Sequence, residues 1–168
     1  MAHSSDPHSE RCLSVPQPWA SSVVTGTRDV INRYDRPSSW LTGQRIWIYV
    51  TIPPRSIPGI KDRVQVVIGS VEIYDCIDGE DSQLPGVRKT PGSKAWLIRN
   101  PLVFPDPVPC RSVHSHFAPA DCNPPSVIDQ LRRAEATAVT PHEWQVMQDR
   151  RDRAAYFERA DADWRMAH

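Results

Sequence analysis

Apolar residues recur at every second position in several short segments of the first two-thirds of the chain. The clearest segment is RIWIYVT, in which Ile46, Ile48 and Val50 alternate with Trp47 and Tyr49. Successive side chains of a strand point to opposite faces, so both faces of this segment are apolar. The pattern predicts a strand that is covered on both sides.

Four further segments have the length and the β-branched content of strands. They are Cys12–Val15, Val64–Ile77, Lys94–Arg99 and Leu102–Arg111. Gly69 lies inside the second of them, where a glycine is typical of a bulge or a sharp bend. The prolines of the last segment lack backbone donors, which indicates a sheet edge. These patterns together predict a β-rich domain.

A short helix is expected between the first two strands. Pro16–Ala20 opens it, since proline fits only the entry and first turn of a helix, and Gly26 ends it. Trp19 and Val23 lie about one helical turn apart. This spacing predicts that Trp19 is a core residue rather than a stacking platform.

Two further helices are expected beyond residue 124, where valine and isoleucine give way to alanine, arginine and acidic residues. Ser126 with Asp129, and Thr140 with Glu143, have the spacing of a reciprocal helix cap. The first helix has one apolar stripe that fits a sheet, formed by Val127, Leu131, Ala134 and Ala138. The stripe of the second helix drifts around its axis, so its docking face stays open, and its interleaved charges indicate a solvated face.

The composition narrows the class of protein. The 168 residues suffice for about one domain, and 20 basic and 20 acidic side chains balance to a net charge of zero. No overall field would then attract nucleic acid or an anionic membrane. With 17 prolines against 7 glycines, the loops are expected to be stiff.

No apolar run approaches the roughly 18 residues of a membrane span, and the polar start of the chain lacks an export signal. We therefore expect a cytoplasmic protein without a membrane partner.

One group of residues has the chemistry of a zinc site. Cys110, His114, His116 and Cys122 offer two sulfurs and two imidazoles, a set that tetrahedral zinc accepts. Their spacing differs from that of the usual zinc fingers. The expected state is therefore an irregular linker with free thiols, without a metal or cofactor. The motifs of serine hydrolases, P-loop enzymes, zinc proteases and dinucleotide-binding enzymes are absent from the sequence.

The order of several motifs resembles the ASCH domain, a member of the PUA-like superfamily. These motifs are LSVPQPWA at 13–20, GTRDVINR at 26–33, LTG at 41–43, AWLIRNP at 95–101 and PDPVP at 105–109. The resemblance implies an α+β fold, a PUA-like mixed β-barrel with short flanking helices and a C-terminal helical extension. It divides the chain into a disordered leader at 1–10, the barrel at 11–113, and a linker with C-terminal helices at 114–168 that pack on or extend the barrel.

The family signature in the first loop looks like Gly-x-Lys-x-x-Glu-x-Arg. Gly26 and Arg33 match it, whereas Arg28 replaces the lysine and Ile31 replaces the glutamate. Some small bacterial ASCH members are amidohydrolases of acetylated cytidine, in which this lysine and a hydroxyl residue at the glutamate position look catalytic. A guanidinium with a pKa above about 12 does not act as a base, and isoleucine has no oxygen to orient water. The resemblance therefore favours binding over catalysis for this chain.

ASCH proteins are associated with RNA, and the residues around this loop suit a nucleotide. Arginine binds phosphates or base edges, and aromatic side chains stack on bases. Arg88 and two lysines surround Pro91 and Gly92 in a loop that is expected to close over the same cleft. The predicted nucleic-acid-binding residues are Gln17 for a base edge, Tyr34 and Trp40 for stacking, and Arg28, Arg33, Lys89 and Lys94 for phosphate. The expected ligand is RNA, rather than DNA, or a modified nucleotide.

Three alternatives stay open. In the first, Arg33 pairs with a neighbouring aspartate and Trp40 fills the barrel, which leaves no nucleotide site. In the second, the protein is a ribonuclease or a deacylase of modified cytidine, with Glu72 or Asp75 among its catalytic acids. In the third, it is a protein-interaction module, which a neutral or acidic cleft mouth would favour. The oligomeric state is open as well.

Overall fold

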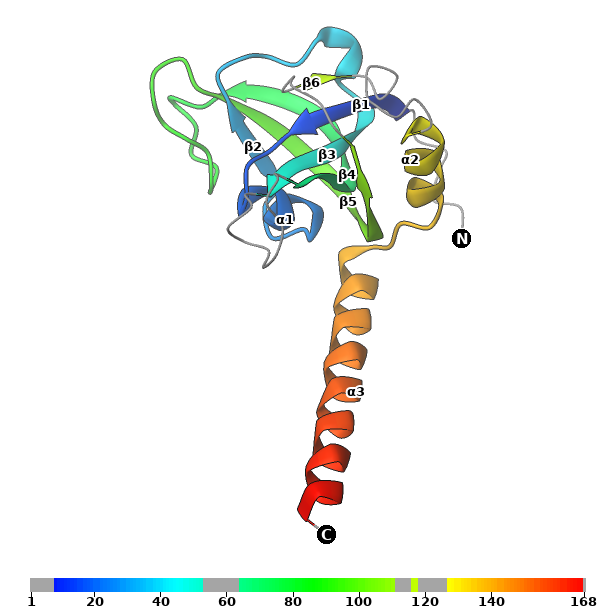
Figure 1. Cartoon of the computed structure of the whole chain (residues 1–168). Coiled ribbons are helices and arrows are strands. Elements are labelled where there is room, and N and C mark those ends of the chain that lie inside the picture. Colours follow the sequence, from blue (N-terminus) through cyan, green and yellow to red (C-terminus); the bar gives the residue numbers. More distant parts are fainter. Residues whose placement is uncertain (1–7, 53–63, 111–115, 118–126, 168) are drawn as a thin grey trace.

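One curled, mixed β-sheet organises the molecule (Figure 1). The computed structural model describes residues 8–52, 64–110, 116–117 and 127–167. Within these ranges six strands pair in the order β2-β5-β4-β3-β1-β6. Their bounds are β1 His8–Ser14, β2 Val30–Arg33, β3 Gln44–Ile52, β4 Val64–Asp78, β5 Lys94–Pro109 and β6 His116–Phe117. β1 runs parallel to β3, and the other paired strands are antiparallel.

Helices flank the sheet and extend from it. α1 (Trp19–Val24) and the short 3-10 helix η1 (Ser39–Leu41) connect the first strands, and α2 (Val127–Ala136) and α3 (Pro141–Ala167) follow the last one. Side chains of α1 pack against one face of the sheet and those of α2 against the opposite face. The expected α+β class, with a mixed barrel-like sheet, short flanking helices and a C-terminal helical extension, is confirmed.

The strands follow the sequence pattern with several differences. The two segments expected on either side of Asn100 form one continuous strand, β5. Asn100 has a φ of 50°, a conformation that asparagine adopts more readily than most residues, so the strand bends there without ending. β1 begins at His8, inside the segment expected as a leader. β2 was expected to be a loop, but it pairs with the first residues of β5.

The prediction that β3 is covered on both faces is confirmed. Ile46, Ile48 and Val50 lie in one apolar core together with three residues of α1. Trp47 and Tyr49 lie in a second core beneath α2. Every one of these β3 side chains is almost fully buried, so the sheet separates two cores and helices cover both of its faces.

Gly69 allows α1 to approach the sheet closely. A Cβ atom at this position would lie 2.2 Å from the carbonyl oxygen of Leu102 and 2.9 Å from Cγ1 of Val24. Both distances are too short for a real side chain, so only glycine fits between β5 and α1. The pairing register of β4 is also irregular beside Gly69, as the sequence predicts.

A buried polar network holds α2 on the second core. Glu135 accepts a hydrogen bond from the Ser70 hydroxyl at 2.9 Å and one from Trp47 Nε1 at 3.1 Å. Arg45 donates to Ser70 Oγ at 3.1 Å, and its Nε lies 3.6 Å from a Glu135 oxygen. Burial raises the pKa of Glu135 despite the nearby Arg45. The network therefore ties α2 to β3 and β4 through a buried ion pair.

α3 projects away from the sheet (Figure 1). Its start is fixed by the expected reciprocal cap, in which Thr140 N–H donates to Glu143 at 2.8 Å and Glu143 N–H donates to Thr140 Oγ1 at 3.3 Å. Trp144 packs against the first core. From Asp149 onward, every side chain whose exposure is described is exposed, so only the first turns of α3 dock. No helix in the described part of the chain is long and apolar enough to cross a membrane.

Candidate nucleotide-binding pocket

A pocket of about 320 Å³ lies between α1, β2 and the loop 79–93 that joins β4 to β5. One part of its wall is apolar and comes from the end of β1 and from α1. The other part comes from β2, the segment before it and the loop, and it holds the arginines beside Val30 and Ile31. The residues that shape the argument are Val15, Pro16 and Trp19 on the apolar side, and Arg28, Asn32, Arg33 and Arg88 on the polar side. The lining holds three arginines and no carboxylate.

Trp19 lies at the pocket and not in the core. It shares the pocket wall with Val23, as their helical spacing implies, but 49% of Trp19 is exposed. The expectation that it is a core residue is wrong, because the inward positions of this short helix are taken by Ala20, Val23 and Val24. The guanidinium carbon of Arg28 lies 4.3 Å from the centre of the Trp19 ring, so the two side chains form a cation–π pair.

Side chains before and within β2 hold the loop against the pocket. Arg28 Nη2 and Asn32 Nδ2 both donate to the carbonyl oxygen of Gly86, each at 2.9 Å. Asn32 Oδ1 accepts a hydrogen bond from the backbone N–H of Arg88 at 2.8 Å. Val87 is buried beside Val30 in a small apolar cluster. These contacts bring Arg88 to the pocket.

Arg88 also contacts Tyr34, which lies just outside the lining. Its guanidinium carbon is 5.4 Å from the centre of the Tyr34 ring, and 61% of Tyr34 is exposed. The Tyr34 hydroxyl lies 3.4 Å from Thr90 Oγ1. Hydrogen bonding with Thr90, and then hydrogen bonding and charge attraction with Arg88, lowers the pKa of Tyr34. Tyr34 therefore marks the rim of the pocket next to Arg88.

Arg33 differs from the other two arginines because it has a carboxylate partner. Its Nε and Nη2 donate to Asp35 at 2.7 and 3.2 Å, and its guanidinium carbon lies 5.0 Å from the Trp96 ring centre. The aspartate pair of Arg33, one part of the first alternative, is therefore present. In the described part of the chain, no carboxylate lies within ion-pair distance of Arg28 or Arg88. The uncompensated positive charge of the pocket therefore belongs to these two residues.

Besides Tyr34, four of the predicted binding residues lie outside the lining. Gln17 exchanges hydrogen bonds with Ser21 in the first turn of α1. Trp40 is 50% exposed in η1, with the Arg11 guanidinium carbon 5.8 Å from its ring centre, so it does not fill the barrel. Lys89 is exposed in the loop 79–93. Lys94 lies at the start of β5 in a separate network.

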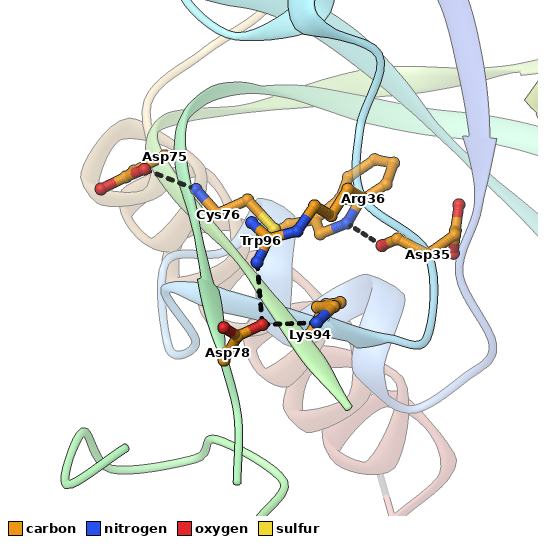
Figure 2. A network of polar contacts seen from close by, with 7 residues as sticks. All are labelled: Asp35, Arg36, Asp75, Cys76, Asp78, Lys94 and Trp96. Atoms are coloured by element: carbon orange, nitrogen blue, oxygen red, sulfur yellow. Dashed lines mark hydrogen bonds and ion pairs between the residues drawn. The ribbon is translucent and has the colours of Figure 1, made fainter. Parts of the chain in front are cut away.

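Figure 2 shows the network that includes Lys94. Lys94 and Arg36 both donate to one carboxylate oxygen of Asp78, and Arg36 does so at 2.8 Å. The hydrogen bond from Lys94 lowers the pKa of Asp78. Close by, Trp96 Nε1 donates to the Asp35 carbonyl oxygen at 2.8 Å. The network ties the segment after β2 to β4 and β5, and its two cations are already paired.

The candidate catalytic acids also lie outside the pocket lining. Glu72 is buried in β4 and accepts hydrogen bonds from Arg99 at 2.6 and 2.9 Å and from Asn100 at 3.0 Å. The hydrogen bond from Arg99 lowers the pKa of Glu72. Asp75 accepts a hydrogen bond from the N–H of Cys76 at 2.7 Å. Neither carboxylate is placed to act as a base on a ligand in this pocket.

The possible zinc ligands fall mostly outside the described residues. His114 and Cys122 lie there, and His116 is described only as part of the backbone of β6. Cys110 is buried in the second core. Cys76 is a free cysteine, and Cys12 is buried in the same core as Cys110.

No family model and no curated protein matches the chain. Solved structures do. A crystal structure of ASCH from Zymomonas mobilis aligns with 17% identity and a TM-score of 0.44, over 77% of this chain and 96% of that chain. A serine-to-alanine mutant of the same protein aligns with 22% identity and a TM-score of 0.37, over 76% of this chain and 80% of that chain. A tyrosine-to-phenylalanine mutant aligns with 22% identity and a TM-score of 0.35, over 62% of this chain and 74% of that chain.

The chain is similar to ASCH proteins. The sequence motifs resemble the same domain. The two positions at which the sequence departs from the ASCH signature, Arg28 and Ile31, both line the pocket. The signature segment and the pocket therefore coincide in this chain.

Proposed function

We propose that this pocket binds a single nucleotide unit of RNA or a modified nucleotide. The observation that carries the proposal is the pair of arginines, Arg28 and Arg88, which face one pocket without a carboxylate partner in the described part of the chain. Guanidinium groups left without acids are suited to a phosphate, because two N–H groups of the planar guanidinium donate to two phosphate oxygens. The mouth of the pocket is thus basic, which disfavours the protein-interaction alternative.

Arg28 is suited to stack on a base. Its guanidinium already lies against the ring of Trp19, and one of its N–H groups donates to the carbonyl oxygen of Gly86. A guanidinium plane offers a second face to a nucleobase, as in many RNA-binding sites. The neighbouring wall of Val15 and Pro16 supplies an apolar surface for the base edge. The base would then lie near α1, and the phosphate would lie toward Arg88.

The size of the pocket limits the ligand to one nucleotide unit. A volume of about 320 Å³ is at the lower end of ligand pockets, which span roughly 300 to 1,000 Å³. A longer strand would continue over the rim, where Tyr34 offers an exposed aromatic face. Because the chain as a whole has no net charge, the attraction is local and the affinity should depend strongly on salt.

The experiment is an anisotropy titration of a short fluorescent single-stranded RNA at two salt concentrations. We expect Arg28→Ala and Arg88→Ala each to weaken binding roughly tenfold, through the loss of base stacking at Arg28 and of a hydrogen bond to a charged phosphate at Arg88. Arg88→Ala should also reduce the salt slope by about 0.7, the value for one phosphate contact on a single strand. Unlabelled DNA of the same sequence and free nucleosides serve as competitors and report on sugar and base preference.

Arg36→Ala is the matched control, because it also removes an exposed arginine. Arg36 lies outside the pocket lining and is paired with Asp78. It should leave affinity and salt slope unchanged. Equal losses in all three variants would indicate a general charge effect, and no loss in Arg28→Ala and Arg88→Ala would remove the pocket as the binding site.

A further inference from the structure

Both backbone polar groups of Arg88 are held by side chains. Its N–H donates to Asn32 Oδ1 at 2.8 Å, and its carbonyl oxygen accepts a hydrogen bond from Ser93 Oγ at 2.6 Å. Ser93 is almost fully buried at the end of the same loop. The backbone of Arg88 is therefore held in place on both sides, while its side chain lines the pocket.

Asn32 fixes the preceding residues as well. Its Nδ2 donates to the carbonyl oxygen of Gly86, so one amide side chain spans the backbone from residue 86 to residue 88. Gly86 has a φ of 78°, a conformation that glycine adopts without strain, which makes a tight turn possible at this point. Val87 lies between the two anchored groups and is buried against Val30.

Both polar atoms of the Asn32 side chain are held by the loop, which leaves one N–H and one oxygen lone pair. Asn32 lines the pocket, but its oxygen and its nitrogen each already have a partner in the loop. Its contribution to binding would therefore act through the loop and through Arg88 in particular. An oriented arginine loses less conformational freedom when it binds a phosphate than a freely moving one.

We propose that Asn32 is a positioning residue, which sets the backbone of Arg88 so that its guanidinium meets the phosphate of the bound nucleotide. This inference rests on the proposed function of the pocket. It assigns the site two parts: a stacking part at Arg28 and Trp19, and a phosphate-binding part at Arg88 whose geometry Asn32 determines.

The test is a double-mutant cycle with the RNA titration as its readout. We expect Asn32→Ala to weaken binding roughly five- to tenfold in the wild-type background. In the Arg88→Ala background the same change should weaken binding less than twofold, since the group that it positions is gone. Ser93→Ala removes the second anchor of Arg88 and should show the same dependence on Arg88, which keeps the test decisive if Asn32→Ala folds poorly.

Hydrogen exchange gives a readout without ligand. The Arg88 amide should exchange faster in Asn32→Ala, because its acceptor is missing. Ser82→Ala is the control within the loop: Ser82 Oγ accepts from the Leu84 N–H at 3.1 Å, away from Arg88, so RNA affinity should not change.

The outcomes separate the two proposals. If Arg88→Ala leaves affinity unchanged, the proposed function of the pocket fails. If Arg88→Ala weakens binding but Asn32→Ala has no effect, or weakens it equally in both backgrounds, Asn32 does not act through Arg88 and the inference is overturned.

Discussion

Arginines have different partners on the two sides of the sheet. Beneath α2, Arg45 is buried and interacts with a carboxylate and a hydroxyl, Glu135 and Ser70. At the pocket, Arg28 and Arg88 lie against aromatic rings and have no carboxylate within ion-pair distance in the described ranges. Arginine is thus part of a buried ion-paired network on one side of the sheet. On the other side its positive charge is available to a ligand.

The comparison separates stability from binding. A buried charge needs its counter-charge, so removing one partner of the α2 network leaves the other at high cost. A half-exposed arginine on an aromatic ring is solvated, so removing it should cost little stability. Variants beneath α2 should therefore change the free energy of unfolding, and variants at the pocket should change RNA affinity.

The largest expected effect is on stability beneath α2. Glu135→Gln should lower the free energy of unfolding by about 3 to 5 kcal/mol, because Arg45 would remain buried without its ion-pair partner. Urea unfolding measures the change. RNA affinity of the folded variant should equal that of the wild type. A variant that is as stable as the wild type would show that the ion pair does not hold α2.

An intermediate effect is expected at Glu72. Glu72→Gln should cost about 1 to 2 kcal/mol of stability, since Arg99 donates to a buried carboxylate. The folded pKa of Glu72 is lowered, so this contribution is present above the ordinary value of 4.5 and disappears as the pH falls through the folded pKa. The stability difference between wild type and Glu72→Gln should therefore shrink on acidification, as unfolding curves across that pH range would show.

Glu135 should have the opposite pH dependence. Its pKa is raised by burial, so its contribution to stability falls as the pH rises from 4.5 to the folded pKa.

The Glu72→Gln variant, together with Asp75→Asn, also tests the hydrolase alternative. If RNA or acetylated cytidine is turned over by the wild type and product formation disappears in these variants, the assignment of a structural role to Glu72 is wrong.

The smallest effect is expected at Lys94. Lys94→Ala should change RNA affinity by less than twofold and leave the salt slope unchanged, because Lys94 is paired with Asp78 and lies outside the pocket lining. The anisotropy titration measures both quantities. A tenfold loss would extend the binding surface from the pocket to the network of Figure 2.

The sequence predicts the strands better than the site. β3 and β4 have strong period-two patterns, and each is long enough for the pattern to decide. β2 has only four residues, and its two polar ones, Asn32 and Arg33, look like a loop until β5 pairs with them. Short strands of this kind depend on their neighbours and not on their own sequence.

The site residues divide in the same way. The signature segment pointed to Arg28 and Arg33, which line the pocket. Asn32 lies between them at an unspecified position of the signature, and its role depends on a loop that is more than fifty residues away in the chain. Among the basic residues of that loop, only the backbone anchors distinguish Arg88 from Lys89, and the sequence has no signal for them.

Hydrogen–deuterium exchange with and without a short single-stranded RNA tests the central claim most directly, because it locates the contact surface without any mutation. We expect slower exchange on RNA binding at the backbone amides of β2 and at residues 86–88, the two segments that frame the polar side of the pocket. Protection confined to α3 or to the surface of α2, with these segments unchanged, would contradict the assignment of the pocket as the nucleotide-binding site.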